Sequence, residues 1–155
     1  MSVRMARPED GPEVVRLASV MYESMGLDVS GGAWRENDRR MVEERSGGDD
    51  CAVFVVEDAE RSGRLVSCGG VTILTRLPGP GVPTARFGYV QWMVTDPEHR
   101  RRGHARAVFE SILSWLPERG VRNVELHATP EGEPLYRSYG FDEPRYPQLR
   151  AGLEG

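Results

Sequence analysis

The stretch that most constrains the fold is a strand, a glycine-containing loop, a helix and a second strand in direct succession. Residues 86–94 form a β-prone segment that Asp96 and Pro97 stop. Apolar residues then recur at helical spacing from about 105 to 115, and an alternating β-prone segment follows at 121–128. Two strands joined by a helix form a βαβ unit. We therefore expect them to run parallel in one sheet, with a right-handed crossover.

The rest of the chain adds strands and helices around this unit. Further strand-like segments are 3–7, 51–56, 65–74 and, with weaker character, 141–153, and helical spacing covers about 13–25, 34–44 and 132–139. Asp10 is a candidate cap for the first of these helices. The order β-α-α-β-β-β-α-β-α-β predicts an α/β (α+β) fold: a mixed sheet with helices on its faces.

Two local patterns predict detail within the sheet. Gly69 and Gly70 lie in the middle of the strand at 65–74, which predicts a bulge or kink there. The strand at 86–94 alternates, so its side chains should divide between two faces. One face is predicted to carry Val90, Trp92 and Val94, and the other Tyr89, Gln91 and Met93.

Length and composition exclude several classes of protein. A chain of 155 residues fits a single domain, which we place at 1–155. No apolar run approaches the ~20 residues that span a bilayer, and the first eight residues lack the apolar core of a secretion signal. Cys51 and Cys68 are typical of buried thiols in a reducing compartment, so we expect a cytoplasmic protein without membrane contact.

The basic residues narrow the chemistry further. All 20 are arginine, which excludes a lysine Schiff base or a P-loop lysine. Two cysteines, and three histidines without HExxH spacing, predict no metal site. Four arginines within seven residues (100, 101, 102 and 106) form one small basic spot on a chain of net charge −4. Nucleic acid needs a wider basic face, so a single phosphate-bearing ligand fits better, with a nucleic-acid binder as an alternative.

The loop before the helix at 105–115 suits that ligand. Its residues are Arg100, Arg101, Arg102, Gly103, His104 and Ala105. The first N–H groups of a helix lack internal acceptors and carry the positive end of its dipole. Small residues let an anion approach this backbone, and arginines add charge-assisted hydrogen bonds. The pattern predicts a pyrophosphate site; the alternative is a solvated basic turn capped by glycine.

At this point the sequence resembles a known family. Arg100-x-x-Gly103-x-Ala105, after a strand ending in Val94, resembles the Q/R-x-x-G-x-G/A motif of the GNAT superfamily of acetyl-CoA-dependent N-acetyltransferases. The run from Leu135 to Phe141, LYRSYGF, is similar to the family's LYxxxGF segment. The resemblance implies a mostly antiparallel sheet of six to seven strands and about four helices. It also implies that the parallel pair at 86–94 and 121–128 splays apart.

The resemblance also implies roles for individual residues. Trp92, Met93 and Val94 would offer backbone groups to the pantetheine arm of acetyl-CoA, and residues 100–105 would hold its pyrophosphate. Tyr136 stands where many members keep a tyrosine that protonates the leaving thiolate. Its alternative role is to pack beneath the last strands.

Several positions depart from the family's pattern or leave a role open. Thr129 stands where many members contact the cofactor through an asparagine, and it keeps only an oxygen. Many members also carry a glutamate base on the strand at 86–94, where this chain has Val90 and Gln91. Glu125 and His127 are alternative bases, or ordinary strand-surface residues.

The acceptor is the least determined part of the prediction. Trp34 and Tyr22 fall where the family builds its acceptor site, and helix packing explains both equally well. We predict an N-acetyltransferase that uses acetyl-CoA, without a metal, on a primary amine of a small molecule or peptide. A catalytically silent CoA-binding regulatory module of the same fold and the use of another acyl donor are the alternatives. Exposed strand edges would allow a homodimer.

Overall fold

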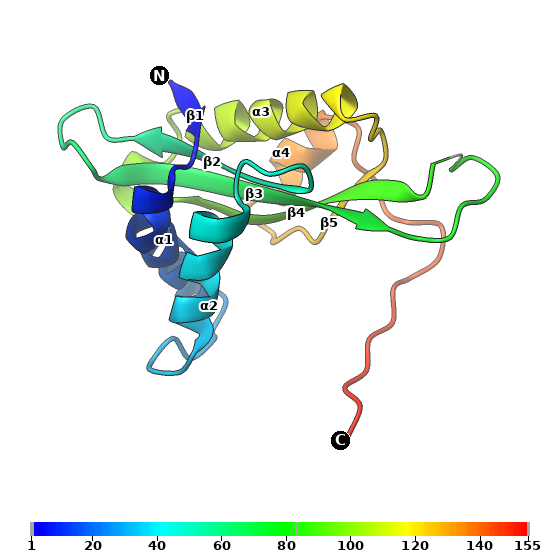
Figure 1. Cartoon of the computed structure of the whole chain (residues 1–155), viewed down its shortest axis with the longest axis horizontal. Coiled ribbons are helices and arrows are strands. Elements are labelled where there is room, and N and C mark those ends of the chain that lie inside the picture. Colours follow the sequence, from blue (N-terminus) through cyan, green and yellow to red (C-terminus); the bar gives the residue numbers. More distant parts are fainter. Residues whose placement is uncertain (1, 83, 155) are drawn as a thin grey trace.

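The computed structural model of the chain has one five-stranded sheet in the order β1-β2-β3-β4-β5, with helices on both faces (Figure 1). The structure describes residues 2–82 and 84–154. Met1, Pro83 and Gly155 belong to the predicted domain but lie outside the described residues. The strands are β1 (Val3–Met5), β2 (Cys51–Glu57), β3 (Leu65–Thr75), β4 (Arg86–Thr95) and β5 (Val124–Leu126). The α-helices are α1 (Gly11–Ser24), α2 (Trp34–Arg40), α3 (His104–Glu118) and α4 (Glu133–Ser138).

Short non-α turns of helix complete the connections. They are η1 (Pro8–Asp10), η2 (Met41–Arg45, a π-helix) and η3 (Pro97–His99). Asp10 directly precedes α1 as predicted, but its carboxylate accepts hydrogen bonds from the Arg7 N–H and the Arg4 guanidinium instead of capping the helix. None of the helices in the described part of the chain is long and apolar enough to cross a bilayer.

The predicted parallel pair is confirmed. β1 to β4 pair antiparallel in sequence order, and β5 pairs parallel with β4 from Gly88 opposite Val124 to Val90 opposite Leu126. The crossover between them is α3, which packs on the sheet through Val108, Phe109 and other apolar residues. β5 is shorter than the predicted 121–128.

The prediction of six to seven strands is wrong for the described residues, which contain five. The predicted last strand at 141–153 is irregular chain that extends away from the domain (Figure 1). Pro144 and Pro147 interrupt this segment, and proline has no N–H for a strand ladder. Phe141 is half-buried against the core, whereas the other large apolar side chains of the segment, Tyr146, Leu149 and Leu153, are exposed.

The prediction of two regular faces on β4 is also wrong, because the strand contains a bulge. Cys68 pairs with Val94 and Gly70 with Gln91, so a single β3 residue lies opposite two residues of β4. The bulge therefore inverts the alternation. Val90 and Met93 pack toward α3, whereas Trp92 and Val94 belong to the cluster on the α1 side.

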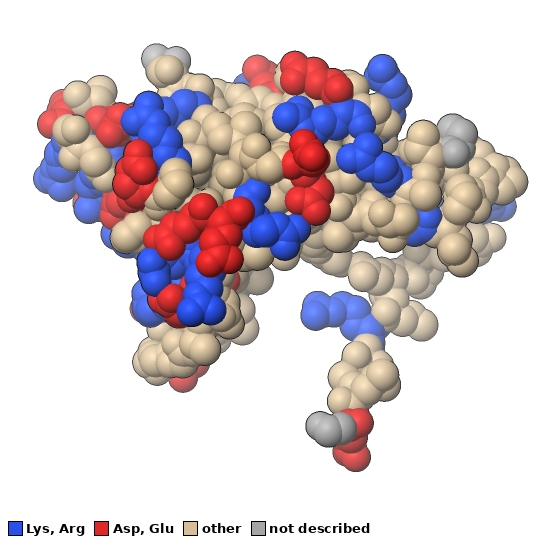
Figure 2. All heavy atoms as spheres, viewed as in Figure 1, with Lys and Arg blue, Asp and Glu red and all other residues tan. Residues whose placement is uncertain are grey.

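The two faces of the sheet carry separate apolar clusters. One contains the buried residues of α3 and Tyr136 of α4, and the other contains Val14 and Leu17 of α1 together with Val42. On the face viewed in Figure 2, acidic and basic side chains are interspersed over α2, where Arg39 pairs with Glu36 and Glu43. The loop after β4 and the loop after β5 lie at the same end of the sheet, because these two strands run parallel.

Candidate functional site

The candidate site begins where two parallel strands separate. Pairing between β4 and β5 ends at Val90 and Leu126, yet β4 continues to Thr95. Within the described residues, the β5-facing edge of residues 91–95 therefore has no neighbouring strand. Backbone N–H and C=O groups without a strand partner are free to bind an extended ligand.

The bulge at this opening positions the predicted residues Trp92, Met93 and Val94. Trp92 has a φ of 58°, in the left-handed region that non-glycine residues seldom adopt. The Cys68 thiol donates to its carbonyl oxygen at 3.4 Å. Opposite the bulge, a Cβ added at Gly69 would overlap the Met93 sulfur, so only glycine leaves room for the Met93 side chain.

The predicted pyrophosphate loop has the geometry of an anion site. Arg101 and Gly103 both have left-handed backbones, with φ values of 62° and 83°. Gly103 immediately precedes α3, and the Ala107 N–H donates to its carbonyl at 3.0 Å. The N–H groups of His104 and the following two residues precede this first helical hydrogen bond, so they have no acceptor within α3. With the helix dipole behind them, they form a concentrated set of donors for an anion.

The loop is anchored at both ends by side chains. Asp96 is buried, and its two carboxylate oxygens accept hydrogen bonds from the Arg16 guanidinium of α1 at 3.0 and 2.9 Å. Arg100 donates to the Thr95 carbonyl at 3.2 Å and lies 3.9 Å from the Glu131 carboxylate. The loop after β4 therefore faces the loop after β5 across the opening.

The other loop residues differ in their surroundings. Arg101 and Arg102 are exposed, and Ala105 is half-buried. His104 is half-buried, and burial lowers the pKa of its imidazole, with His99 and Arg102 acting in the same direction. Its Nδ1 is buried and has no hydrogen-bond partner among the described residues. A neutral His104 can donate from one ring nitrogen without adding charge to the loop.

Tyr136 lies on α4 against the aromatic cluster of α3. Its ring centroid is 5.1 Å from that of Phe109 and 6.4 Å from that of Phe141. The ring also lies close to Gly132, where an added Cβ would come within 2.9 Å of Tyr136 Cε2. Burial raises the pKa of the phenol, so the hydroxyl stays protonated at neutral pH. The residue is therefore placed for packing and retains the proton that a general acid needs.

Thr129 precedes α4 and is occupied by its own turn. Its hydroxyl accepts a hydrogen bond from the Gly132 N–H at 3.3 Å, and its carbonyl accepts from Gly132 and Glu133. The predicted contact between Thr129 and a cofactor stays a prediction. The structure assigns the residue an additional role in starting α4.

The two candidate bases lie on or directly after β5. Glu125 forms an ion pair with Arg76, which lies in the loop after β3. His127 follows the last β5 residue, and its ring nitrogens hydrogen bond the Tyr89 hydroxyl and, at 2.5 Å, Oε1 of Gln148. Both side chains therefore have polar partners, and His127 lies at the level where the two strands part.

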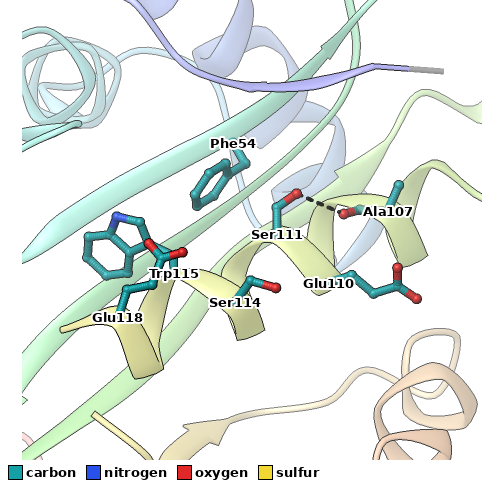
Figure 3. Close-up of a pocket in the computed structure, with 7 residues that line it drawn as sticks. All are labelled: Phe54, Ala107, Glu110, Ser111, Ser114, Trp115 and Glu118. Atoms are coloured by element: carbon teal, nitrogen blue, oxygen red, sulfur yellow. Dashed lines mark hydrogen bonds between the residues drawn. The ribbon is translucent and has the colours of Figure 1, made fainter. Parts of the chain in front are cut away.

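Two hollows occur near these elements, on opposite sides of the sheet. The first, about 400 Å³, lies along the flank of α3 beside β2, where Phe54, Ser111 and Trp115 line it (Figure 3). The second, about 290 Å³, is lined by Tyr22, Leu27, Asp28, Trp34 and Asp38. Trp92 of the bulge donates from Nε1 to the Tyr22 hydroxyl at 3.1 Å, so the second hollow is joined to the strand opening by a direct side-chain contact.

Sequence reasoning missed Arg16 and Asp38, which shape this region, and it missed the anchoring role of Asp96. Arg16 lies between the buried residues Val15 and Leu17, which was the available sign that its charge needed a partner. Which carboxylate would be that partner could not be inferred from local pattern, because 80 positions separate Arg16 from Asp96.

Comparison with known proteins identifies similar sequences. The model of the acetyltransferase (GNAT) family matches residues 15–141. Serotonin N-acetyltransferase 2 of rice, a chloroplastic protein, is 30% identical over 141 residues, which are 85% of this chain and 65% of that protein. The chain thus spans slightly less than two thirds of the rice protein's length. Glucosamine 6-phosphate N-acetyltransferase of Arabidopsis thaliana is 30% identical over 117 residues, 74% of this chain and 75% of that protein.

Solved structures share the fold. A predicted acetyltransferase from Clostridium acetobutylicum, crystallised with acetyl-CoA, superposes with a TM-score of 0.83 at 19% identity, covering 96% of this chain and 95% of that one. A GCN5-related N-acetyltransferase from Ralstonia eutropha gives a TM-score of 0.81 at 25% identity, covering 97% of each chain.

Proposed function

The chain belongs to the acetyltransferase (GNAT) family, and on this basis we propose that it is an acyltransferase that transfers the acetyl group of acetyl-CoA to a primary amine of a small molecule or peptide. One observation carries the proposal. The donor-rich start of α3 is joined by the loop at 96–103 to the part of β4 that has separated from β5. An extended thioester arm and a pyrophosphate need these two features side by side.

The residues present fit acetyl-CoA. The N–H groups at the start of α3 and the arginines at 100–102 would hold the pyrophosphate, and the left-handed Gly103 keeps a side chain out of the turn. The free edge of β4 at Trp92, Met93 and Val94 would bind the pantetheine arm through backbone groups. When bound, the co-substrate supplies an activated acyl group. The chain supplies N–H donors for the developing oxyanion and orients the amine for attack.

We assign Tyr136 as the general acid. Burial keeps its phenol protonated, and α4 follows the loop whose Glu131 lies 3.9 Å from Arg100. A phenol in this position can give its proton to a leaving thiolate.

For the proton lost by the amine, His127 is the better of the two candidate bases. The carboxylate of Glu125 is already paired with Arg76, whereas the ring nitrogens of His127 contact only neutral groups, the Tyr89 hydroxyl and Gln148 Oε1, and imidazole is the side chain that most often serves as a general base. His127 also lies just beyond the last paired residue of β5, next to the opening.

The test is calorimetric titration of the purified chain with acetyl-CoA, followed by measurement of thiol release with a panel of primary amines. We expect saturable binding that Gly103→Glu abolishes, because the glutamate strains the turn and adds negative charge where the phosphates would lie. Glu44→Gln, an exposed change away from the loop, is the matched control. Binding that survives Gly103→Glu would refute the pyrophosphate assignment. Binding without thiol release from any amine would favour the silent module.

A further inference from the structure

The hollow between α1 and α2, defined above by Tyr22, Leu27, Asp28, Trp34 and Asp38, has a distinctive chemical lining. Two aromatic rings form one side: Tyr22 and Trp34 meet edge to face, with centroids 5.3 Å apart. Leu27 adds an apolar surface that is 52% exposed. The remaining two residues are carboxylates. At about 290 Å³ the hollow is at the small end of ligand pockets, whose volumes range upward from about 300 Å³.

The carboxylates of the hollow lack cationic partners. Among the described residues, neither Asp28 nor Asp38 forms an ion pair with an arginine, although arginines are abundant on α2. Arg39 is engaged by Glu36 and Glu43 instead. Asp38 is half-buried, and its one described hydrogen bond is a long one of 3.4 Å from the Tyr22 hydroxyl. A half-buried carboxylate with so little compensation is favourable only if a cation or a good donor reaches it.

The electrostatics of the two carboxylates agree with this geometry. Burial raises the pKa of Asp38, which reflects the cost of holding its charge without a counter-ion. Hydrogen bonds from Ser30 lower the pKa of Asp28, so that group stays ionised. Arg35 lies beside the hollow, with its guanidinium 4.6 Å from the Trp34 ring centroid, but it donates to the Val29 carbonyl and forms no described ion pair with Asp28 or Asp38. A phosphate in the hollow would therefore meet two carboxylates.

The hollow is connected to the proposed site of transfer. The Tyr22 hydroxyl accepts a hydrogen bond from Trp92 Nε1 at 3.1 Å, and Trp92 is the left-handed residue of the β4 bulge. A ligand resting on the Tyr22 ring thus lies one side chain away from the strand edge assigned to the thioester arm.

We propose that the α1–α2 hollow binds the acceptor, and that this acceptor is a compact primary amine with an aromatic or apolar body and no phosphate. Asp38 attracts the incoming ammonium group, and the body of the acceptor packs on the rings of Tyr22 and Trp34. The same nitrogen gives up its proton to the base, for which His127 is proposed above, before it attacks the thioester. The inference rests on the proposed N-acetyl transfer and specifies the acceptor class for it.

Three small ligands separate the contributions. 2-Phenylethylamine carries both the ammonium and the ring. O-Phosphoethanolamine keeps the aminoethyl arm but replaces the ring with a phosphate, and 2-phenylethanol keeps the phenylethyl arm but has no charge. In calorimetric titrations of the chain saturated with CoA, which has no acetyl group to transfer, we expect 2-phenylethylamine to bind at least about ten-fold more tightly than either of the others. 2-Phenylethanol lacks the charged hydrogen bond, and O-phosphoethanolamine lacks the ring contact and places a phosphate beside two carboxylates.

Variants locate the binding. Asp38→Asn should weaken 2-phenylethylamine about ten-fold and leave 2-phenylethanol unchanged, and Trp34→Leu should weaken both. Glu44→Gln removes a carboxylate six positions further on, outside the hollow, and should change neither. Equal affinity for 2-phenylethylamine and 2-phenylethanol in the unaltered chain would overturn the proposal without reference to any variant. So would O-phosphoethanolamine as the tightest ligand.

Thiol release from acetyl-CoA distinguishes this inference from the proposed function. Release with 2-phenylethylamine, with KM raised in Asp38→Asn, supports both. Release with O-phosphoethanolamine alone leaves acetyl transfer standing and overturns the assignment of the hollow. Amine binding without thiol release from any amine overturns acetyl transfer and, with it, the acceptor role.

Discussion

Replacing Tyr136 with phenylalanine should separate a catalytic phenol from a packing ring. A general acid contributes about 10²–10⁴-fold to a rate, so we expect Tyr136→Phe to lower kcat within that range. The affinity for acetyl-CoA should stay nearly constant, because the change removes a proton donor and leaves the backbone at Arg100 to Ala105 untouched. Since burial raises the pKa of the phenol, unaltered Tyr136 keeps its proton throughout the neutral range of the assay.

The structure predicts a small effect of the same change on stability. The ring packs on Phe109 and Phe141, and phenylalanine preserves both contacts. The Tyr136 hydroxyl donates no hydrogen bond to any described residue, so its loss should change the free energy of unfolding by less than about 1 kcal/mol. Tyr136→Ala would empty the site and should cost about 3–5 kcal/mol. At roughly 2–4 °C per kcal/mol for a chain of this size, that lowers Tm by about 10 °C.

Thiol release measures the rate, and thermal unfolding checks the fold. The chain's own thiols, Cys51 and Cys68, are buried, and burial raises the pKa of both, so they should react slowly with a thiol reagent. An unchanged kcat in a stable Tyr136→Phe protein would refute the role of acid. A Tm loss as large as that of Tyr136→Ala would show that the hydroxyl has a structural partner.

Three further changes test the structure around the site. Gly69→Ala should lower the free energy of unfolding by about 1–3 kcal/mol in urea titrations, because its Cβ would overlap the Met93 sulfur; an unchanged midpoint would mean that Met93 moves aside freely. Asp96→Asn removes the charge paired with the partly exposed Arg16, so it should lower the free energy of unfolding by about 2 kcal/mol and weaken acetyl-CoA binding. An unchanged affinity for acetyl-CoA would argue against an anchoring role for Asp96. Burial raises the pKa of Cys68 from 9.0 to about 12, so the stability linked to its neutral thiol is complete below pH 9 and is lost as pH rises toward 12. Cys68→Ala should flatten this decline in the free energy of unfolding. Parallel plots of that free energy against pH for the two proteins would contradict the prediction.

The parts of the fold that were predictable depend on short-range pattern. The helical spacing behind α3 and the β-prone runs behind β2, β3 and β4 lie within single segments. The parallel pairing of β4 and β5 follows from their succession alone, since a helix between two strands leaves few alternatives. The loop from Arg100 to Ala105 was predictable for the same reason, because its chemistry depends on the start of one helix.

The bulge was half predicted, and the missing half has a physical cause. Gly69 and Gly70 correctly predicted an irregularity, but the extra residue is on β4, at Trp92. The side on which a bulge forms depends on packing across strands. Here Met93 fills the space left by the missing Cβ of Gly69, and the alternation of β4 shifts. Nothing within the β4 sequence contains that information.

The last predicted strand failed for the opposite reason. Its weak strand character was present, but a strand also needs a neighbour and donors, and Pro144 and Pro147 remove two donors from a short segment. The result is an exposed, irregular terminus in which Gln148 contacts His127. Weak local propensity did not outweigh the missing ladder hydrogen bonds.

Long-range contacts from α1 determine how the two halves of the candidate site are aligned. Arg16 binds Asp96, at the start of the loop proposed for pyrophosphate, and Tyr22 binds Trp92, at the bulge proposed for the thioester arm. Six residues separate Arg16 and Tyr22, a rise of about 9 Å along the helix, so one rigid element contacts both ends of the segment 92–96. The same helix contributes Tyr22 to the α1–α2 hollow. A substitution that shifts α1 should therefore change acceptor binding and acetyl-CoA binding together.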